Sequence, residues 1–287
     1  MLRIGLVFNT YYKDAGQTYI KQRLTQCFLK NAAVCVPFNA YTSYGLTPSL
    51  PPLDAVVFWD KDVYAAMHLE RLGLKVFNNA QAIAVCDDKA KTYEVLAQLK
   101  NIALIPTILA PLCYENSLQD VDEALLDKLE HSLGHPLIVK HNTGSLGGQV
   151  YLAKDRAELT KLYLKLKTLP HQYQKFVGKS GSDTRVYTIG GKAIAVLERH
   201  NPDSFIANVA GGGMATLVKN PQPQLIDLAE TIAKKLNLDY AAIDFLYDCD
   251  TGMYFFLEAN ASAYFKAVES LGVSIAEPFV EYICKKI

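Results

Sequence analysis

Residues 240–260 read YAAIDFLYDCDTGMYFFLEAN and carry the clearest evidence for the fold. Two apolar runs with the composition of β-strands flank a turn-forming segment at 250–252. Antiparallel pairing of the runs brings Asp244 close to Glu258 and Asn260, whose side chains leave the same face of their strand. Two carboxylates and an amide in one place repel each other unless a cation lies between them. We therefore expect a metal site in an enzyme that uses phosphates, with Mg²⁺ as the first candidate and Mn²⁺ as the second.

The same hairpin is also compatible with a purely structural role. Asp-Thr-Gly turns and an asparagine at a strand end are ordinary features of hairpins, and Glu258 can pair with a lysine instead of a metal. The hairpin alone does not decide between a metal site and a structural role, so the decision depends on the motifs in the rest of the chain.

Length and charge limit the classes of function. The chain has 287 residues, enough for more than one compact unit, and carries 29 basic and 29 acidic side chains. Because there is no basic excess, binding to nucleic acid or to a membrane surface is not expected. No apolar stretch approaches the roughly 20 residues of a membrane span, and the N-terminus lacks the pattern of a signal peptide. We expect a soluble, cytoplasmic protein.

Strand-like and helix-like segments predict three units of mixed α/β structure. Residues 1–88 alternate apolar strands with helices, as in a parallel α/β domain. Residues 89–171 form a central unit with a glycine-rich loop, and residues 172–287 form a C-terminal unit that contains the hairpin. Both of these later units are expected to be α+β. The expected helices lie at about 18–31, 63–72, 81–100, 156–167, 224–235 and 275–285.

The glycine-rich loop lies within VKHNTGSLGGQVY, residues 139–151. A strand and not a helix follows it, so the segment matches neither a Walker A loop nor a dinucleotide fingerprint, which both place phosphate at a helix N-terminus. A loop between strands can instead close over phosphates with its backbone N–H groups, and Gly144, Gly147 and Gly148 permit unusual backbone angles there. A plain hairpin connection without a ligand is the alternative.

Four charged side chains fit a phosphate site of this kind. Lys140 ends the strand before the loop, and Lys89 begins a helix after two aspartates, so each can meet phosphate as a point charge. Arg185 and Arg199, on neighbouring strands, can direct guanidinium groups at phosphate or carboxylate. Surface exposure of the lysines and structural salt bridges of the arginines are the alternatives.

Two further segments complete the candidate site. The strand edge at 174–177 can offer main-chain donors and acceptors to a purine. Asn208, which precedes the glycines at 211–213, can face phosphate or metal, or it can form a turn. Tyr11, Tyr12, Tyr264 and Phe265 are either packing residues or the lining of a substrate pocket.

Taken in order, these segments resemble the ATP-grasp superfamily and, within it, the RimK-like carboxylate–amine ligases. The similarity covers about residues 75–285, and residues before them match the parallel α/β pre-grasp domain more weakly. Each motif is common, but the ordered set is specific. It consists of DDK, PLIVK, TGSLGGQV, YQKFV, SDTRVYTIGGKAIAVLER, AN-x-x-GGG and AAIDFL…FFLEANAS.

The resemblance implies an ATP-grasp fold and a role for each matching residue. ATP is held by residues that contact its phosphates, adenine and ribose: Lys89, Lys140, Gly144, Ser145, Gly147, Gly148, Gln174, Lys175, Phe176, Val177, Asp183 and Asn208. Within this set the resemblance places Asp183 at the ribose and Asn208 near the γ-phosphate. The implied Mg²⁺ ligands are Asp244, Glu258 and Asn260, and the implied catalytic residues at the transferred phosphoryl group are Arg185 and Arg199.

Members of the family phosphorylate a carboxylate, and an amine then attacks the acyl-phosphate. Such a transfer needs positioning and charge neutralisation and no protein nucleophile. The resemblance implies an ADP-forming ligase with small-molecule carboxylate and amine substrates, either amino acids or peptides, and many relatives are oligomers. A catalytically silent nucleotide-binding module that acts as a scaffold or regulator is one alternative. Delivery of the acyl group to another nucleophile, such as a thiol, is a second.

The chain departs from the family pattern at three places. Lys175 stands where the adenine-binding hinge usually carries an acid, and Ala210-Gly211 replace a His-Arg pair. The usual NASPG reads NASAY here, with Ala263-Tyr264 in place of Pro-Gly. The second and third changes fall where the acceptor should bind, so they put in doubt a transfer of the glutamate-adding specificity of RimK and leave the ATP chemistry intact.

Overall fold

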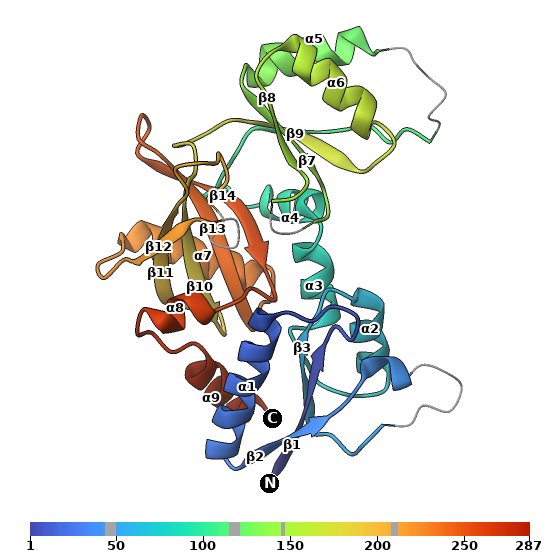
Figure 1. Cartoon of the computed structure of the whole chain (residues 1–287), viewed down its shortest axis with the longest axis vertical. Helices are drawn as coiled ribbons and strands as arrows, with labels where there is room; N and C mark the ends of the chain where they lie inside the picture. The colour runs from blue at the N-terminus through green and yellow to red at the C-terminus, as the bar shows by residue number, and fades with distance from the viewer. Residues whose placement is uncertain (44–49, 115–120, 145–146, 208–211) are drawn as a thin grey trace.

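The computed structural model describes residues 1–43, 50–114, 121–144, 147–207 and 212–287 (Figure 1). Its strands are β1 (Leu2–Phe8), β2 (Ala33–Pro37), β3 (Ala55–Trp59), β4 (Val76–Phe77), β5 (Ala103–Leu104), β6 (Thr107–Leu109), β7 (Leu137–His141), β8 (Val150–Ala153), β9 (His171–Lys175), β10 (Ser182–Ile189), β11 (Lys192–His200), β12 (Met214–Leu217), β13 (Tyr240–Asp248) and β14 (Met253–Asn260). Its helices are α1 (Ala15–Lys30), the 3₁₀ turn η1 (Ala40–Ser43), α2 (Val63–Arg71), α3 (Ala80–Cys86), α4 (Lys89–Leu96), α5 (Glu123–Leu133), α6 (Arg156–Leu166), α7 (Pro223–Lys235), α8 (Lys266–Ser270) and α9 (Ala276–Lys286). None of the helices in the described ranges has the length and apolar character that crossing a membrane requires.

The N-terminal unit is a parallel sheet in the order β2-β1-β3-β4, as the sequence predicts. All five residues of β3 are buried, because helices cover both faces of such a sheet. From β1 the chain continues to β2, which lies on one side of β1 in the sheet, and later to β3, which lies on the other side of β1. Asn9 and Asp60 directly follow β1 and β3, so they stand at the carboxyl edge where the strand order reverses.

The expected helix at 81–100 is wrong as a single element, because the segment forms two helices, α3 and α4. The Asp88 carboxylate accepts hydrogen bonds from the N–H groups of Ala90 (3.0 Å) and Lys91 (3.2 Å) and thereby caps a new helix. The N–H of Lys89 donates to the Asn142 carbonyl (2.8 Å). This bond ties the start of α4 to the loop after β7.

The central unit is an antiparallel sheet in the order β6-β9-β7-β8, with α5 and α6 over one face (Figure 1). The sequence did not predict α5. Strand β9 pairs with both β6 and β7, so the expected boundary at 171/172 falls inside a strand of this sheet. Strand β5, in turn, joins the C-terminal sheet beside β14. We keep the three-unit division as a proposal, with the second boundary moved past Lys175.

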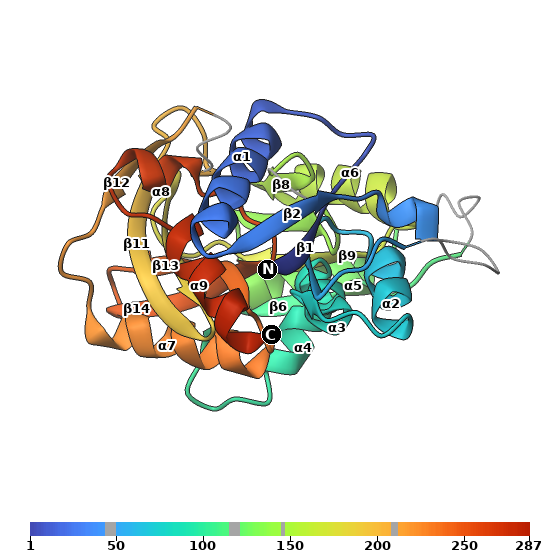
Figure 2. The ribbon, with the colours of Figure 1, turned by 90° about the horizontal axis from the view of Figure 1, so that it is seen from below.

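The C-terminal unit is a six-stranded sheet in the order β12-β11-β10-β13-β14-β5. The predicted hairpin is β13–β14, and its register pairs Asp244 with Glu258 and Ala242 with Asn260, with a bulge after Asp244. Helix α7 lies along one face, which Figure 2 shows from below. Ala241 and Ile243 face that helix, whereas the residues that alternate with them face the N-terminal unit.

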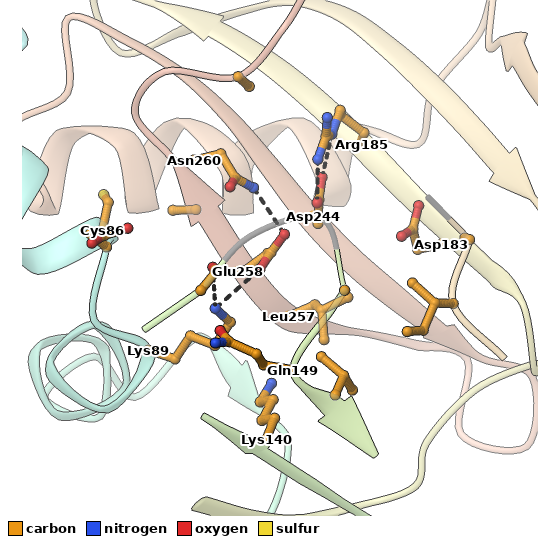
Figure 3. A pocket seen from close by; sticks show the side chains of 18 of the residues that line it. Cys86, Lys89, Lys140, Gln149, Asp183, Arg185, Asp244, Leu257, Glu258 and Asn260 are labelled. Carbon is orange, nitrogen blue, oxygen red and sulfur yellow. Dashed lines mark hydrogen bonds and ion pairs between the residues drawn. The ribbon is translucent and has the colours of Figure 1, made fainter. Parts of the chain in front are cut away.

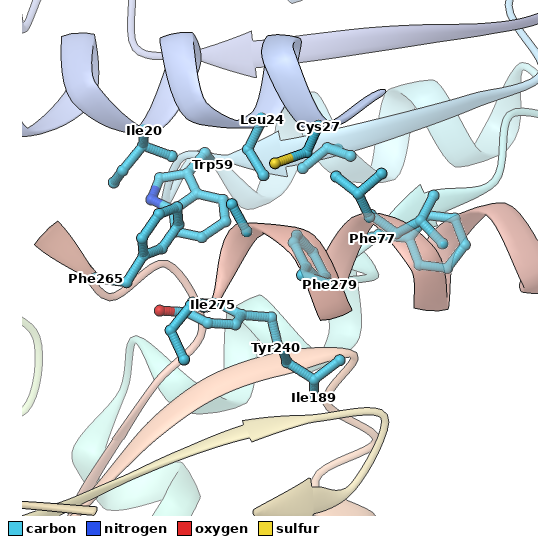
Figure 4. Close-up of a cluster of buried hydrophobic side chains, with 14 of the residues drawn as sticks. Ile20, Leu24, Cys27, Trp59, Phe77, Ile189, Tyr240, Phe265, Ile275 and Phe279 are labelled. Atoms are coloured by element: carbon cyan, nitrogen blue, oxygen red, sulfur yellow. The ribbon is translucent and has the colours of Figure 1, made fainter. Parts of the chain in front are cut away.

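The N-terminal unit and the C-terminal sheet share one hydrophobic core (Figure 4). The ring centroid of Trp59 on β3 lies 4.9 Å from the ring centroid of Tyr240, 5.6 Å from that of Phe265 and 6.1 Å from that of Phe279. Helices α1 and α9 lie side by side across the same core in both ribbon views (Figures 1 and 2). This packing fixes the N-terminal sheet relative to the β13–β14 hairpin.

A buried asparagine adds a polar link between the same parts. The side-chain amide of Asn78 donates to the carbonyls of Tyr240 (2.7 Å) and Ala261 (2.8 Å). Its side-chain oxygen accepts from the N–H groups of Asp239 (2.6 Å) and Tyr240 (3.1 Å). Asn78 therefore satisfies main-chain groups at the open end of the hairpin, where β13 begins and β14 ends.

We expect Asn78→Ala to lower the free energy of unfolding by about 3 kcal/mol, because buried main-chain donors and acceptors lose their partners. Urea denaturation measures the change. Asn101→Ala, at an exposed position, is the matched control and should stay within about 0.5 kcal/mol of the wild type. Equal unfolding midpoints for the two variants would contradict the role of Asn78.

Candidate active site

A cavity of about 820 Å³ lies between the three sheets. Ligand and cofactor sites typically measure about 300–1,000 Å³, so the volume suits a nucleotide together with a small substrate. The predicted site residues that line it are Lys89, Lys140, Gly144, Gly147, Gln174, Lys175, Phe176, Val177, Asp183, Arg185, Arg199, Asp244, Glu258 and Asn260. Gly148 is exposed and is not among the described lining residues. Ser145 and Asn208 lie outside the described residues.

Glu258 and Asn260 on β14 point into this cavity from one strand face (Figure 3). The Asn260 amide nitrogen donates to Glu258 Oε1 (3.1 Å), and Lys89 Nζ lies 3.9 Å from Glu258 Oε2. Burial alone would raise the pKa of Glu258, but Lys89, the Asn260 amide, Arg185 and Lys140 together lower it to about 2. Glu258 is therefore a carboxylate at any physiological pH.

Asp244 is fully buried and is held by two arginines. Arg185 Nε and Nη2 donate to its two oxygens, each over 2.7 Å, and Arg199 Nη2 donates to Oδ2 over 2.9 Å. This bidentate geometry is the strong form of a carboxylate–guanidinium pair. Asp244 thus lies beside Glu258 as predicted, but both of its oxygens already accept hydrogen bonds.

Asp183 extends the same chain of charges. Arg199 Nε and Nη2 donate to its two oxygens, each over 2.6 Å. Burial and the nearby charge of Asp244 raise the pKa of Asp183, and the Arg199 guanidinium opposes this rise. The salt bridges that the sequence offered as an alternative for the arginines are therefore present, and both guanidinium groups also line the cavity.

The donors around Glu258 are suited to a hard cation. Among the described residues, no group of three or more His, Cys, Asp or Glu side chains is arranged to hold a metal. Glu258 and Asn260 nevertheless place a carboxylate and a side-chain amide side by side, although the amide presents its nitrogen to Glu258 and has to rotate to offer its oxygen to a cation. Carboxylate and amide oxygens are the ligand type that Mg²⁺ takes from a protein when phosphates and waters complete its shell. Asp244 adds a third oxygen ligand only by sharing an oxygen with an arginine.

The two predicted lysines reach the cavity from different elements, Lys89 from α4 and Lys140 from β7. Lys89 Nζ donates to the Gly144 carbonyl (3.1 Å), and Lys140 Nζ donates to Gln174 Oε1 (2.8 Å). Lys140 is 4% exposed and forms no ion pair with any described carboxylate. Burial lowers the pKa of Lys140 to about 8, the charge of Lys89 adds to the decrease, and Glu258 opposes it. An anion placed beside Lys140 would relieve this desolvation.

The glycine loop joins β7 to β8 as predicted, and its ends are tightly packed. Gly144 has φ +132°, and a Cβ there would clash with the side-chain oxygen of Gln149. Gly147 has φ +74° and lies against Ile206. The structure does not test closure of this loop over a ligand, so closure stays a prediction.

At Lys175 the segment 174–177 differs from the expectation that its main chain is available to a purine. The N–H of Lys175 donates to the Pro106 carbonyl (2.9 Å), and its side chain is exposed, so this main-chain donor is used within the sheet. The Gln174 side chain is likewise held, since Nε2 donates to Thr107 Oγ1 (2.8 Å). Phe176 and Val177 line the cavity and leave the strand pairing at that point.

Apart from Tyr12, sequence reasoning missed the residues of one wall of the cavity, which comes from the N-terminal unit. We call it the N-terminal wall, and it consists of Asn9, Tyr12, Gln17, Trp59, Asp60 and Lys61. Polar residues directly after parallel strands at the point where strand order reverses are the signal that predicts such a wall. Of the four aromatic candidates, Tyr12 and Tyr264 line the cavity, Phe265 is buried in the shared core and Tyr11 is 88% exposed.

Tyr264, which replaces the glycine of the usual family motif, connects this wall to the C-terminal unit. Its hydroxyl donates to Asp14 Oδ2 (3.0 Å), and its main-chain oxygen accepts from the Tyr187 hydroxyl (3.1 Å). A Cβ on Gly16 would clash with the Tyr264 ring, so the first turn of α1 needs glycine for the ring to lie there. The substitution therefore reshapes the cavity beside the N-terminal wall.

Comparison with known sequences identifies relatives over most of the chain. Residues 86–283 match the model of the RimK-like ATP-grasp domain. An uncharacterized protein of Mycoplasma pneumoniae is 30% identical over 91% of this chain and 92% of that protein. N-acetylaspartylglutamate synthase A of Homo sapiens is 32% identical over 73% of this chain, which spans only 52% of that synthase.

Comparison with solved structures supports the fold. The ATP-grasp ligase PsnB complexed with a minimal precursor superposes with a TM-score of 0.73 at 17% identity and covers 100% of both chains. D-alanine–D-alanine ligase from Bacillus anthracis, complexed with ATP, gives a TM-score of 0.73 at 17% identity over 99% of this chain and 97% of that one. At this identity the likeness establishes the ATP-grasp fold and nothing finer.

The lowered pKa of Lys140 predicts a pH-dependent stability. The unfolded chain holds this proton up to about pH 10.5 and the folded chain only up to about pH 8, so the destabilisation caused by Lys140 is full below pH 8 and disappears as the pH rises to 10.5. We expect Lys140→Met to raise Tm by roughly 5 °C at pH 7 and to lose this advantage near pH 10.5.

Scanning calorimetry at both pH values tests this expectation. Lys161→Met, at an exposed position of α6, is the matched control and should leave Tm unchanged at both. A difference between wild type and Lys140→Met that is the same at pH 7 and pH 10.5 would show that Lys140 is not desolvated.

Proposed function

The chain belongs to the RimK-like ATP-grasp family, and we propose that it is an ADP-forming carboxylate–amine ligase that works through an acyl-phosphate. ATP-dependent ligation is the chemistry of this family, and the relatives include proteins named as synthases and ligases. The observation that carries the proposal is the presence of Glu258 and Asn260 together with two lysines in one cavity. Such a set matches the charges of a metal-bound triphosphate.

We assign the nucleotide to the side of the cavity formed by the β7–β8 loop and β9. Lys89 and Lys140 supply positive charge for the phosphates, and Lys140 gains the counter-ion that the described residues do not give it. Phe176 and Val177 line the space for the adenine. Asp183 can still receive a ribose hydroxyl, because a carboxylate oxygen accepts more than one hydrogen bond.

We assign Mg²⁺, or Mn²⁺ in its place, to Glu258 and Asn260. The ion, when bound, neutralises phosphate charge and holds the phosphates in place. Lys89, 3.9 Å from Glu258, keeps this carboxylate ionised and ready to act as a ligand. Asp244 holds Arg185 and Arg199 in fixed positions, and all three line the cavity. We assign the transferred phosphoryl group to this side.

The proposed reaction has two steps. A carboxylate oxygen of the substrate attacks the γ-phosphorus of ATP, the bond from that phosphorus to the β,γ-bridging oxygen breaks, and ADP leaves. The amine then attacks the acyl carbon, the C–O bond to phosphate breaks, and the nitrogen loses a proton. Arg185 and Arg199 stabilise charge on the transferred group, because their guanidinium groups are pre-oriented by buried carboxylates.

The substrates are proposed to be amino acids or peptides. Relatives are named for N-acetylaspartylglutamate and β-citrylglutamate synthesis and for α-L-glutamate ligation, and PsnB is seen in complex with a precursor peptide. Tyr264 beside the N-terminal wall and Ala210-Gly211, which lie outside the described residues, argue against the same acceptor specificity here. A cytoplasmic location, which the sequence suggests, and a homo-oligomer, which the family resemblance suggests, are also parts of the proposal.

One observation favours a second candidate, the catalytically silent nucleotide-binding module. Both oxygens of Asp244 accept hydrogen bonds from arginines, so Asp244 completes the set of three metal ligands only by sharing an oxygen with a guanidinium group. A silent module binds Mg·ATP and releases no ADP with any acceptor. The mass of the product separates amide formation from transfer to a thiol.

We expect Glu258→Gln to reduce substrate-dependent ADP release at least about 100-fold, because a neutral amide no longer holds the metal-bound phosphates. A coupled ADP assay measures the rate, and circular dichroism verifies the fold. Glu281→Gln, exposed on α9, is the matched control and should turn over like the wild type. Normal turnover by Glu258→Gln would refute the metal assignment.

A further inference from the structure

The N-terminal wall occupies the place where parallel α/β sheets bind ligands. Asn9 follows β1 and Asp60 follows β3, and these adjacent strands flank the point where the strand order reverses. Crevices at the carboxyl edge of such a point are preferred binding positions. Both residues line the cavity that also contains Glu258, so this edge faces the proposed reaction centre.

Asp60 is held in position but has no counter-ion. Its Oδ1 accepts from the N–H of Lys61 (2.6 Å) and from the Asn9 amide (3.3 Å). The Lys61 ammonium pairs instead with Asp87, and no described cation forms an ion pair with Asp60. The part of the cavity lined by Asp60, Lys61 and Asp87 therefore carries one excess negative charge.

The opposite side of the cavity has the reverse charge. Lys140, Lys175 and Lys179 line it and form no ion pair with any described carboxylate. The cavity is thus positive where the phosphates are proposed to lie and negative at Asp60. A substrate with a positive group directed toward the N-terminal wall complements this polarity, whereas a purely anionic group there would be repelled.

We propose that Asp60 binds a protonated amino group of the substrate, which makes the substrate at this wall an amino acid or an amino-terminal peptide residue. This inference rests on the proposed ligase function and names the substrate class of the same cavity. Asp60 acts as a specificity-determining residue, and it takes no part in phosphoryl transfer.

Titration calorimetry with Mg²⁺ and a non-hydrolysable ATP analogue tests the proposal. The probes are the twenty proteinogenic amino acids, the N-acetyl derivative of each, and succinate as an anion without an amino group. We expect the wild type to bind at least one free amino acid about 10-fold or more tightly than its N-acetyl form and to bind succinate weakly. Asp60→Asn, which keeps the size of the side chain, should lose this preference and leave affinity for the analogue unchanged.

Asp250→Asn, in the exposed β13–β14 turn, is the matched control and should bind like the wild type. Equal binding of free and acetylated probes, unchanged preference in Asp60→Asn, or no binding of any amino acid would overturn the proposal. The same probes are also titrated without the nucleotide analogue, so that the preference for a free amino group is measured independently of nucleotide binding. Failure of the wild type to bind the ATP analogue would instead contradict the proposed ligase function.

Discussion

The bonds from Arg185 and Arg199 to the buried Asp244 are the interaction on which the rest of the site depends. A carboxylate without solvent exposure is tolerated only when cations and hydrogen bonds compensate it, and two guanidinium groups do so here. Asp183 closes the chain by pairing with Arg199. Ion pairs thereby connect three adjacent strands, β10, β11 and β13, in addition to their main-chain hydrogen bonds. Glu258, on the next strand of the sheet, is held in a fixed position beside Lys89.

The second constraint is the core shared by the N-terminal unit and the C-terminal sheet. Trp59, Tyr240 and Phe279 pack ring against ring, and Asn78 satisfies the main chain where β13 begins. Because of this packing, the carboxyl edge of the parallel sheet faces the hairpin and forms a wall of the same cavity. One rigid face carries the acidic Asp60, and the other carries the lysines, so the polarity of the cavity follows directly from how the two parts pack.

Local features of the sequence were enough to predict much of this arrangement. The alternation around 250–252 predicted the hairpin and the proximity of Asp244 to Glu258, and the apolar run before Lys140 placed that lysine at a strand end. The pairing of both arginines with Asp244 was not predictable, because it depends on register between strands whose paired residues are 59 and 45 positions apart in sequence. The sequence placed a helix start at Lys89, where α4 begins, but it did not predict that α3 ends before it. The polar residues after β1 and β3 are a local signal for the N-terminal wall, whereas the cavity that they face depends on docking between units.

The central claim is that the protein joins a carboxylate to an amine in this cavity and converts ATP to ADP and phosphate. ADP release from Mg·ATP, measured against pooled amino acids, dipeptides and amines, tests it most directly. The account predicts ADP release that requires a particular carboxylate–amine pair, together with an amide product of the matching mass. Tight Mg·ATP binding without ADP release for any combination would contradict the claim and favour the silent nucleotide-binding module.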